Sequence, residues 1–388
     1  MTPTSVNPVL PVAAKRGLGA LASLGIVLVL VGVLKGMPGF WGAFLMSFYL
    51  LVGAGLSGML FFSINRAASA RWDTQIRRVP EAMAATLAVS GVLVLVLLWG
   101  GPKLYSWAQP GALDTPELVG KKFYFSPLFY NLRSIIAVAG WVLFSRLILG
   151  NSRRRDLDGL ASHGASNKKW SILFLLFFAY SFSLMAVDWI GSLQPTWYST
   201  ILGLYCFAGL MQSGLATIIL LVLFLEKAGV LQGRIRDEHR QDLGKWLFAW
   251  SAFWAYMWFA QFMLIWYSDQ PDENQFYLLR GGAWAYMIGL TVLGRFCVPF
   301  FGIASQAAKR NTKVLASVAA VVLLSHWLDV FVLVMPTQTQ GFSVNPLAVI
   351  LPLCAGAEFV LLFFAAFGRQ PAVPEKEPAL AFSQHYHL

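Results

Sequence analysis

His326 and Asp329 are ionisable residues near the middle of an otherwise apolar segment, 314–335. A charged side chain in hydrocarbon costs roughly 2.5–3.5 kcal/mol on insertion scales, so such residues usually face a protein interior or a watery cavity. Their i, i+3 spacing places both side chains on one face of a helix. Two explanations fit this pattern: a proton relay, since histidine exchanges protons near neutral pH, and a buried structural pair.

Other carboxylates lie inside apolar segments at different depths. Glu358 is expected in the inner half of the last span, and Asp188 near the outer end of the fifth. With His326 and Asp329 near the middle, these residues form a ladder of protonatable groups across the membrane. A transmembrane proton path needs such groups at successive depths.

Two arginines inside predicted spans, Arg133 in the fourth and Arg295 in the eighth, favour the structural explanation instead. Buried cations need counter-charges, and the carboxylates of the ladder can supply them. Glu81 lies at a predicted helix start, directly after a proline, where it suits either a capping role or a proton entry point. The proton relay and the ion pairs can coexist.

The composition indicates a protein that crosses the bilayer several times. The 388-residue chain is 57% hydrophobic and only 12% charged, whereas soluble domains carry about 25% charged residues. The net charge of +11 does not indicate nucleic-acid binding, because the basic residues lie in short loops between apolar segments, where they set topology.

Ten apolar segments are each long enough to span the membrane as a helix. They are 17–35, 40–64, 80–101, 126–148, 170–190, 197–226, 245–267, 277–304, 314–335 and 345–368. The predicted fold class is therefore all-α, with an N-terminal tail (1–16), a ten-helix transmembrane domain (17–368) and a C-terminal tail (369–388). The first segment is longer than the apolar core of a signal peptide and no small-residue cleavage site follows it, so we expect a retained helix.

The positive-inside rule orients these spans. Of the 29 Lys and Arg residues, 21 fall in the tails and one set of loops, and four in the opposite loops. Because basic residues accumulate on the cytoplasmic side, both termini are expected in the cytoplasm, in agreement with an even number of spans.

The cysteine and histidine content limits the cofactors of this chain. Cys206, Cys297 and Cys354 lie in apolar segments without C-x-x-C spacing, which excludes covalent haem c and cysteine-ligated iron–sulfur clusters within the chain. His326 is the only intramembrane histidine, whereas a haem b between two helices usually takes two. We expect no cofactor and no metal here.

Three further polar features have ordinary explanations. Arg234–Lys245 carries charges of both signs and is expected to be a surface loop, and Gln261 is expected to form an interhelical hydrogen bond. The C-terminal tail contains three prolines and is expected to be mobile or bound to a partner. Its His385 and His387 fit an exposed tail, with metal binding as the alternative.

Five segments carry a pattern that belongs to one known family. They are Ile76–Glu81; Asp188–Ile190 with Pro195, Trp197, Ser199 and Thr200; Trp258–Tyr267; Arg295–Phe296 with Pro299; and His326–Asp329 with the following Met335–Pro336. In these segments the chain resembles the F subunit of alternative complex III, the bacterial quinol:electron-acceptor oxidoreductase. The resemblance covers about residues 45–365, and the run W-F-A-Q-F-M-L-I-W-Y at Trp258–Tyr267 is its most specific part.

This resemblance implies a membrane subunit related to the NrfD and polysulfide-reductase anchors, with two four-helix bundles plus two extra helices. It implies a non-catalytic subunit without cofactors of its own, in the inner membrane of a bacterium, within a respiratory or photosynthetic electron transport chain. The implied partners are a paralogous quinol-binding membrane subunit, an iron–sulfur subunit and subunits carrying haem c. The implied roles are scaffolding of the complex and conduction of protons.

The polar positions that match the family are Asp188, Arg295, His326 and Asp329. Thr196 departs from the pattern, because some relatives carry histidine at that place, so the outer part of a proton path would here run through water. Three alternatives stay open: a quinol-binding anchor with its own site, a secondary transporter, and a pure scaffold.

Overall fold

The computed structural model describes residues 10–386, and every regular element in that part of the chain is a helix. Ten helical segments are long and apolar enough to cross a membrane, which confirms the predicted all-α, multi-pass fold. They are α1 (Val12–Lys35), α2 (Phe40–Ala67), α3 with α4 (Arg78–Ala85, Leu87–Leu104), α5 (Pro127–Asp158), α6 continued by η5 and η6 (Ala161–Met185, Ala186–Ile190, Gly191–Leu193), α7 (Leu202–Lys227), α8 (Asp237–Ser268), α10 continued by η7 and α11 (Ala283–Val292, Leu293–Cys297, Val298–Gly302), α13 with η8 (Thr312–Val334, Met335–Thr337) and α14 (Leu347–Phe367).

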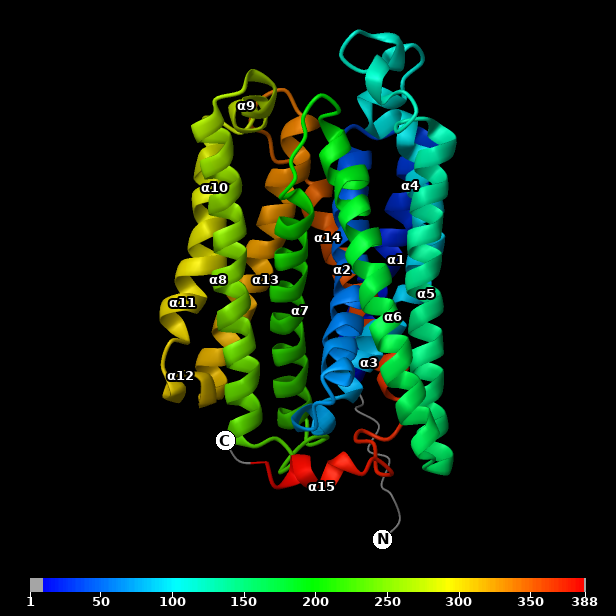
Figure 1. Ribbon diagram of the computed structural model, residues 1–388, viewed down its shortest axis with the longest axis vertical. Coiled ribbons are helices and arrows are strands. Elements are labelled where there is room, and N and C mark those ends of the chain that lie inside the picture. The colour runs from blue at the N-terminus through cyan, green and yellow to red at the C-terminus, as the bar shows by residue number, and fades with distance from the viewer. Residues whose placement is uncertain (1–9, 387–388) are drawn as a thin grey trace.

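Shorter elements lie at the two ends of the bundle (Figure 1). We call the end with the loops 68–77, 159–160, 228–236 and 303–311 the basic end; it carries η1 (Trp72–Gln75), α12 (Gln306–Arg310) and α15 (Ala379–Gln384). The opposite end carries α9 (Pro271–Leu278) and the 3₁₀ turns η2 (Ser106–Ala108), η3 (Ala112–Asp114) and η4 (Val119–Lys121).

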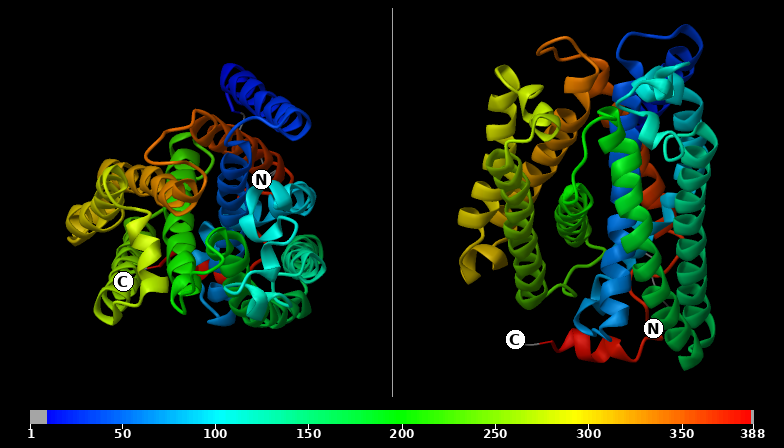
Figure 2. Two further views of the ribbon diagram at one scale, coloured as in Figure 1. Left: turned by 90° about the horizontal axis from the view of Figure 1, so that it is seen from above. Right: turned by 45° about the horizontal axis from the view of Figure 1, so that its top comes forward.

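The spans form two four-helix groups. One group consists of α2, α4, α5 and α6, which pack in a closed ring, and the other consists of α7, α8, α10–α11 and α13. The contact between α2 and α7 joins the groups, and α14 and α1 pack in turn beside α2 (Figure 2). This arrangement agrees with the two bundles and two extra helices that the resemblance implies.

Small residues allow α2 to approach its neighbours closely, as is common between membrane helices. A Cβ atom at Gly214 of α7 would lie 2.1 Å from the Cβ of Ser57 on α2. A Cβ at Gly58 would lie 2.5 Å from the Cβ of Met83 on α3. The glycines therefore fix the distances at which α2 contacts both bundles.

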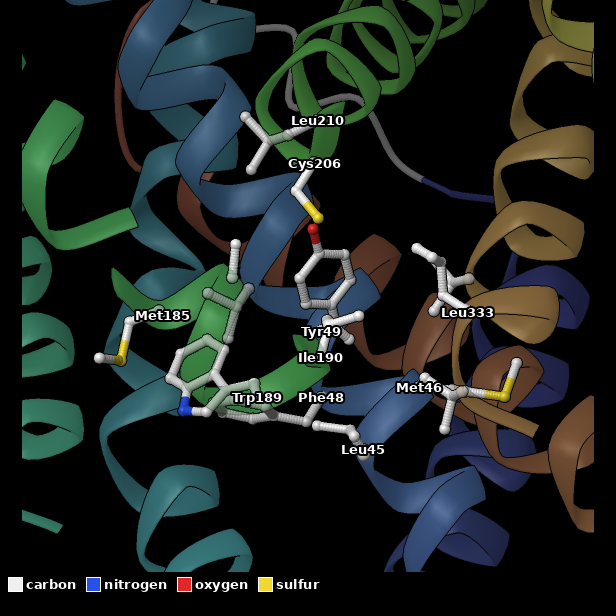
Figure 3. Packing of buried hydrophobic residues seen from close by; sticks show 14 of the residues in the cluster. Leu45, Met46, Phe48, Tyr49, Met185, Trp189, Ile190, Cys206, Leu210 and Leu333 are labelled. Atoms are coloured by element: carbon white, nitrogen blue, oxygen red, sulfur yellow. The ribbon is translucent and has the colours of Figure 1, made fainter. Parts of the chain in front are cut away.

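The α2–α7 contact also has specific side-chain packing. The Tyr49 hydroxyl of α2 points toward the Cys206 sulfur of α7, and Trp189 packs nearby (Figure 3). Phe48 meets Trp189 edge to face, with ring centroids 4.9 Å apart, an arrangement that aromatic pairs prefer. This layer connects α2 to residues next to the polar centre described below.

Several helices extend farther at the basic end than the apolar pattern predicts. The predicted surface loop Arg234–Lys245 is wrong for most of its length, because α8 begins at Asp237. Asp237 and Glu238 in the first turn favour a helix start, since negative charge stabilises a helix N-terminus. The first helix likewise begins at Val12, before the predicted residue 17.

The C-terminal tail folds back onto the basic end. Ser383 of α15 donates a hydrogen bond to the Trp72 carbonyl (2.7 Å), and the Tyr386 hydroxyl donates to Asp242 (2.8 Å). Up to Tyr386 the predicted mobile tail is therefore wrong, because these contacts dock it on its own chain, whereas the alternative of partner binding stays a prediction. His385 is exposed and His387 lies outside the described residues. Within residues 10–386, no cluster of three metal-ligating side chains occurs.

Candidate functional site

Arg295 lies at the centre of η7, a π-helical turn between α10 and α11, and its side chain is fully buried. Pro299, four residues later, has no N–H group and so cannot donate the helical hydrogen bond to the Arg295 carbonyl. Instead the Gln212 side chain of α7 donates to that carbonyl at 2.6 Å. Isolated π-helical turns of this kind are frequent at functional sites.

The Arg295 guanidinium connects η7 to α13. One of its nitrogens, Nη1, donates to a carboxylate oxygen of Asp329 and lies 3.0 Å from Nδ1 of His326. Both partners lie on the same face of α13, as the i, i+3 spacing predicts, and both are more than nine-tenths buried. Since an arginine N–H always donates, Nδ1 of His326 accepts and is unprotonated.

The other guanidinium nitrogens are also satisfied, by α7. Nε donates to the Gln212 side-chain oxygen at 2.8 Å and Nη2 donates to the Gly209 carbonyl at 3.0 Å. The Trp254 ring of α8 covers the guanidinium at 4.5 Å from its centroid. Arg295 therefore ties together all four members of its bundle.

Tyr205 of α7 completes the centre by donating its hydroxyl hydrogen to the second carboxylate oxygen of Asp329. Asp329 thus accepts from a cation and from a phenol, and both of its oxygens have partners. Tyr205 adjoins Cys206, toward which Tyr49 points, so α2 supports the same layer (Figure 3). We refer to Tyr205, Arg295, His326 and Asp329 as the buried centre.

A small cavity of about 30 Å³ lies beside Asp329, and Phe276 of α9 lines it on the side of the opposite end. Gln261, Tyr277 and Arg280 also line it. A cavity of this size holds a water molecule where polar groups surround it. The side chain of Gln261 interacts with Tyr277 of α9, in line with the predicted interhelical hydrogen bond. Its side-chain oxygen is buried without a hydrogen-bond partner among the described residues, and water is a suitable donor for it.

Arg280, in the turn between α9 and α10, closes this cavity toward the opposite end. Its guanidinium donates to the Val332 and Leu333 carbonyls at 3.0 and 2.9 Å and to the Gln194 side chain at 3.0 Å. It therefore supplies donors to two carbonyls near the C-terminal end of α13, which lack helical partners there. In the sequence, Arg280 stands out only as an arginine near the start of the apolar segment 277–304.

Asp188 belongs to a second, separate ion pair. It lies on η5, the other π-helical turn of the described chain, and accepts two hydrogen bonds from Arg133 of α5, at 2.8 and 3.0 Å. Arg133 also donates to the Tyr124 carbonyl, at 3.0 and 3.1 Å. This pair lies in the α2–α4–α5–α6 bundle, and no hydrogen bond among the described residues joins it to the buried centre.

Glu81 lies at the basic end, within a network of charges. It pairs with Arg78 at 2.6 Å, lies 3.6 Å from Arg77 and accepts a hydrogen bond from Ser152 of α5 at 2.6 Å. Its side chain makes no capping hydrogen bond at the start of α3. Glu81 lies in the first turn of α3, where the capping explanation placed it, and it also fastens α3 to α5, which the sequence did not indicate.

Glu358 points away from the other predicted residues. It is half-buried and lines a cavity of about 180 Å³ between α1, α2 and α14, together with Ser47 and Cys354. In the described part of the chain it has neither a hydrogen bond nor an ion pair. The fold thus brings Arg295, His326 and Asp329 together, but it separates Asp188, Glu358 and Glu81 into three other places.

The buried centre can do limited but specific chemistry. With Asp329 ionised beside Arg295, the centre is electrically neutral overall, which makes its burial tolerable. Tyr205, Asp329 and His326 can each gain or lose a proton, and the small cavity adjoins Asp329. A comparison with protein-family models finds no match, and a comparison with curated proteins finds none either.

Proposed function

We propose that this chain is a membrane subunit of a quinol:electron-acceptor oxidoreductase of the alternative complex III type, scaffolding the complex and exchanging protons at the buried centre. The observation that carries the proposal is the convergence of three residues from the matching segments, Arg295, His326 and Asp329, in one centre. The two-bundle arrangement of the spans also supports it. In this proposal the basic end faces the bacterial cytoplasm, and partner subunits hold the haem c and the iron–sulfur clusters.

Proton exchange starts at the carboxylate of Asp329. A proton that arrives through the small cavity neutralises this carboxylate and weakens its attraction for Arg295. The guanidinium then keeps its hydrogen bonds to Gln212 and Gly209, which already accept from two of its N–H groups. His326 becomes free to accept a proton only when Arg295 moves away from Nδ1, so movement of Arg295 controls the relay.

Scaffolding is tested by purification of the full chain with an affinity tag from its native membrane in a mild detergent. Co-purification of subunits that contain haem c and iron–sulfur clusters is the expected result. Purification of the chain by itself, without other subunits and without haem absorbance, would instead support a secondary transporter.

Proton exchange is tested with the intact complex in liposomes, by counting protons released per quinol oxidised. Tyr205→Phe keeps the Arg295–Asp329 pair, whereas Asp329→Asn removes the carboxylate. We expect Asp329→Asn to lower the proton count and Tyr205→Phe to slow release. An unchanged count in Asp329→Asn, with a normal haem content, would restrict the chain to the scaffolding role.

A second candidate function, binding of quinol by this chain itself, is favoured by the cavity beside Glu358. This cavity is lined mostly by apolar side chains of α1, α2 and α14, and Glu358 and Ser47 give it two polar groups. Such a lining suits an apolar ring with polar substituents. Weaker binding of a quinone analogue by Glu358→Gln, with no change in Tyr205→Phe, would support this function.

A further inference from the structure

A third cavity, of about 460 Å³, lies at the basic end, away from the buried centre. Its walls are the end of α2, the turn that follows it, the start of α6 and the C-terminal segment 377–382. We call this space the basic pocket. The docked tail described above forms one side of it. Figure 1 shows α15 crossing beneath the bundle at this end.

The basic pocket is strongly cationic. One carboxylate, Glu377, lines it, against five cations: Arg66, Arg71, Arg77, Arg155 and Lys168. Glu377 pairs with both Arg77 and Arg155, at 2.5 and 3.0 Å. Arg66 pairs with Asp73, which lies outside the lining.

Two of these cations have no anionic partner among the described residues. Arg71 lies over the Phe382 ring, 5.9 Å from its centroid, and Lys168 donates to the Ser69 hydroxyl at 2.7 Å. Both side chains belong to exposed residues at the mouth of the pocket. An anion that enters therefore meets unpaired positive charge first.

Deeper in the pocket, four buried side-chain atoms lack hydrogen-bond partners among the described residues: Nε of Arg66, of Arg77 and of Arg155, and the side-chain oxygen of Asn167. Arg77 is 3% exposed, and its Nε lies 3.6 Å from the Glu81 carboxylate, too far for a hydrogen bond. Asn167, 5% exposed, also lines the pocket; its unsatisfied side-chain oxygen is an acceptor, which takes a hydrogen bond from water or from a protonated phosphate oxygen. Buried polar groups without partners are uncommon in folded proteins, so they point to a ligand or to bound water.

The start of α6 adds a further attraction for anions. Ala161, Gly164 and Ala165 of its first turns line the pocket, and no side chain caps this helix. A helix N-terminus presents free N–H groups and partial positive charge to a bound anion. The Arg155 guanidinium packs against Gly164, so this cation lies directly beside the helix start.

We propose that the basic pocket binds a phosphate group, supplied by the headgroup of an anionic phospholipid or by a soluble phosphate. Arginine matches the geometry of phosphate oxygens, and clusters of basic residues at membrane surfaces recognise anionic headgroups. Lys168 and Arg71 attract the phosphate, Arg77 and Arg155 hold it, and Glu377 occupies the same cations when no ligand is present. This site is independent of the proposed electron-transport role.

The test uses the full chain, purified with its complex and stripped of lipid, and native mass spectrometry or thermal-shift titration. The probes are dioleoylphosphatidylglycerol, zwitterionic dioleoylphosphatidylcholine and inorganic phosphate. The pocket variant is Arg71→Gln/Lys168→Gln, because these exposed residues form no ion pair that folding needs. The matched control is Arg154→Gln/Lys169→Gln, which removes the same charge from exposed residues at the same end, outside the pocket.

We expect the pocket variant to weaken binding of the anionic probe about 10- to 30-fold, given about 1 kcal/mol for each basic residue near an anionic surface. The control variant should bind as the native chain does. Saturable binding of phosphatidylglycerol alone would assign the phosphate to a lipid, and displacement by inorganic phosphate would assign it to a soluble ligand. An equal loss in both variants, or no loss in either, would overturn the proposal.

A second variant, Glu377→Gln, tests the same site in the opposite direction. It removes the carboxylate that competes for Arg77 and Arg155, so the anionic probe should bind more tightly. Unchanged or weaker binding in a folded Glu377→Gln chain would show that these two arginines do not hold the phosphate.

Discussion

Arg295 and Asp329 form a buried ion pair that joins a π-helical turn to the face of a neighbouring helix. Arg295 is fully buried and Asp329 is 5% exposed, so water screens neither charge. The pair therefore makes the position of η7 depend on the charge state of α13. This coupling connects a local backbone irregularity to any proton that reaches Asp329.

Replacing one member of this pair should lower the free energy of unfolding more than replacing both members. Asp329→Asn or Arg295→Gln leaves the other member without its counter-charge, and we expect a loss of about 3–5 kcal/mol in the free energy of unfolding. The double variant should recover part of that loss, because no unpaired charge remains. Denaturant unfolding in detergent micelles measures the cycle, and additive losses would contradict the pairing.

Removing the Tyr205 hydroxyl should have a smaller effect on stability. Tyr205→Phe deletes one hydrogen bond to a carboxylate and leaves the Arg295–Asp329 pair in place, so we expect a loss of about 1.5–3 kcal/mol. Infrared difference spectra should also show a shifted carboxylate band of Asp329. Tyr49→Phe is the control, since Tyr49 points to Cys206 instead; an equal band shift there would contradict this assignment.

Arg280→Gln should loosen the end of α13 and its contact with Gln194, while α5 of the other bundle, which Arg280 does not contact, should stay unchanged. The substitution removes donors to the Val332 and Leu333 carbonyls, and each buried carbonyl left unsatisfied costs about 1–3 kcal/mol. Hydrogen exchange should accelerate in residues 330–337 and stay unchanged in α5. Uniform acceleration across both bundles would indicate global destabilisation instead.

The number of spans could be predicted from the sequence because each apolar run of about 20 residues has only one stable conformation in lipid. The span ends could not, because helices such as α5 and α8 continue into charged residues once they leave the hydrocarbon. Hydropathy predicts which residues lie in the hydrocarbon, whereas local capping and packing determine where a helix ends.

The buried centre could be predicted in part. The spacing of His326 and Asp329 placed them on one face, and the need for counter-charges indicated Arg295 among the possible partners. Tyr205 carries no signal in an aromatic-rich apolar segment. The predicted ladder of protonatable groups does not form, because the depth of a residue along its helix does not determine toward which neighbour its side chain points. Glu358 faces α1, whereas Asp329 faces α7.

The ion pair of Arg66 and Asp73, beside the basic pocket, should make the free energy of unfolding depend on pH. Burial raises the pKa of Asp73 above its ordinary value of 3.8, and the Arg66 guanidinium only partly opposes this rise. The folded state thus holds a proton more tightly than the unfolded state. Asp73 then contributes most to stability below its unfolded pKa, and that contribution is lost as the pH rises through the folded value.

Asp73→Asn, which cannot ionise, isolates this dependence. The native chain should lose stability relative to Asp73→Asn as the pH rises from about 4 toward about 7. Unfolding measured at several pH values in the same detergent gives the difference. A difference that is constant over this range, or that grows in favour of the native chain, would contradict the prediction.

Gly294→Ala should disturb the buried centre through shape alone. A Cβ atom at Gly294 would lie 1.8 Å from the Ser325 hydroxyl oxygen and 2.9 Å from its Cβ, so η7 and α13 would have to separate. Overpacking of this kind typically costs about 1–3 kcal/mol, and here it also moves Arg295 away from His326 and Asp329.

Gly289→Ala is the matched control, because a Cβ there meets no atom within 4 Å. Ser325→Gly should restore the stability of Gly294→Ala by removing the clashing side chain. Equal losses for Gly294→Ala and Gly289→Ala, or no rescue by Ser325→Gly, would show that close contact between η7 and α13 does not position the centre.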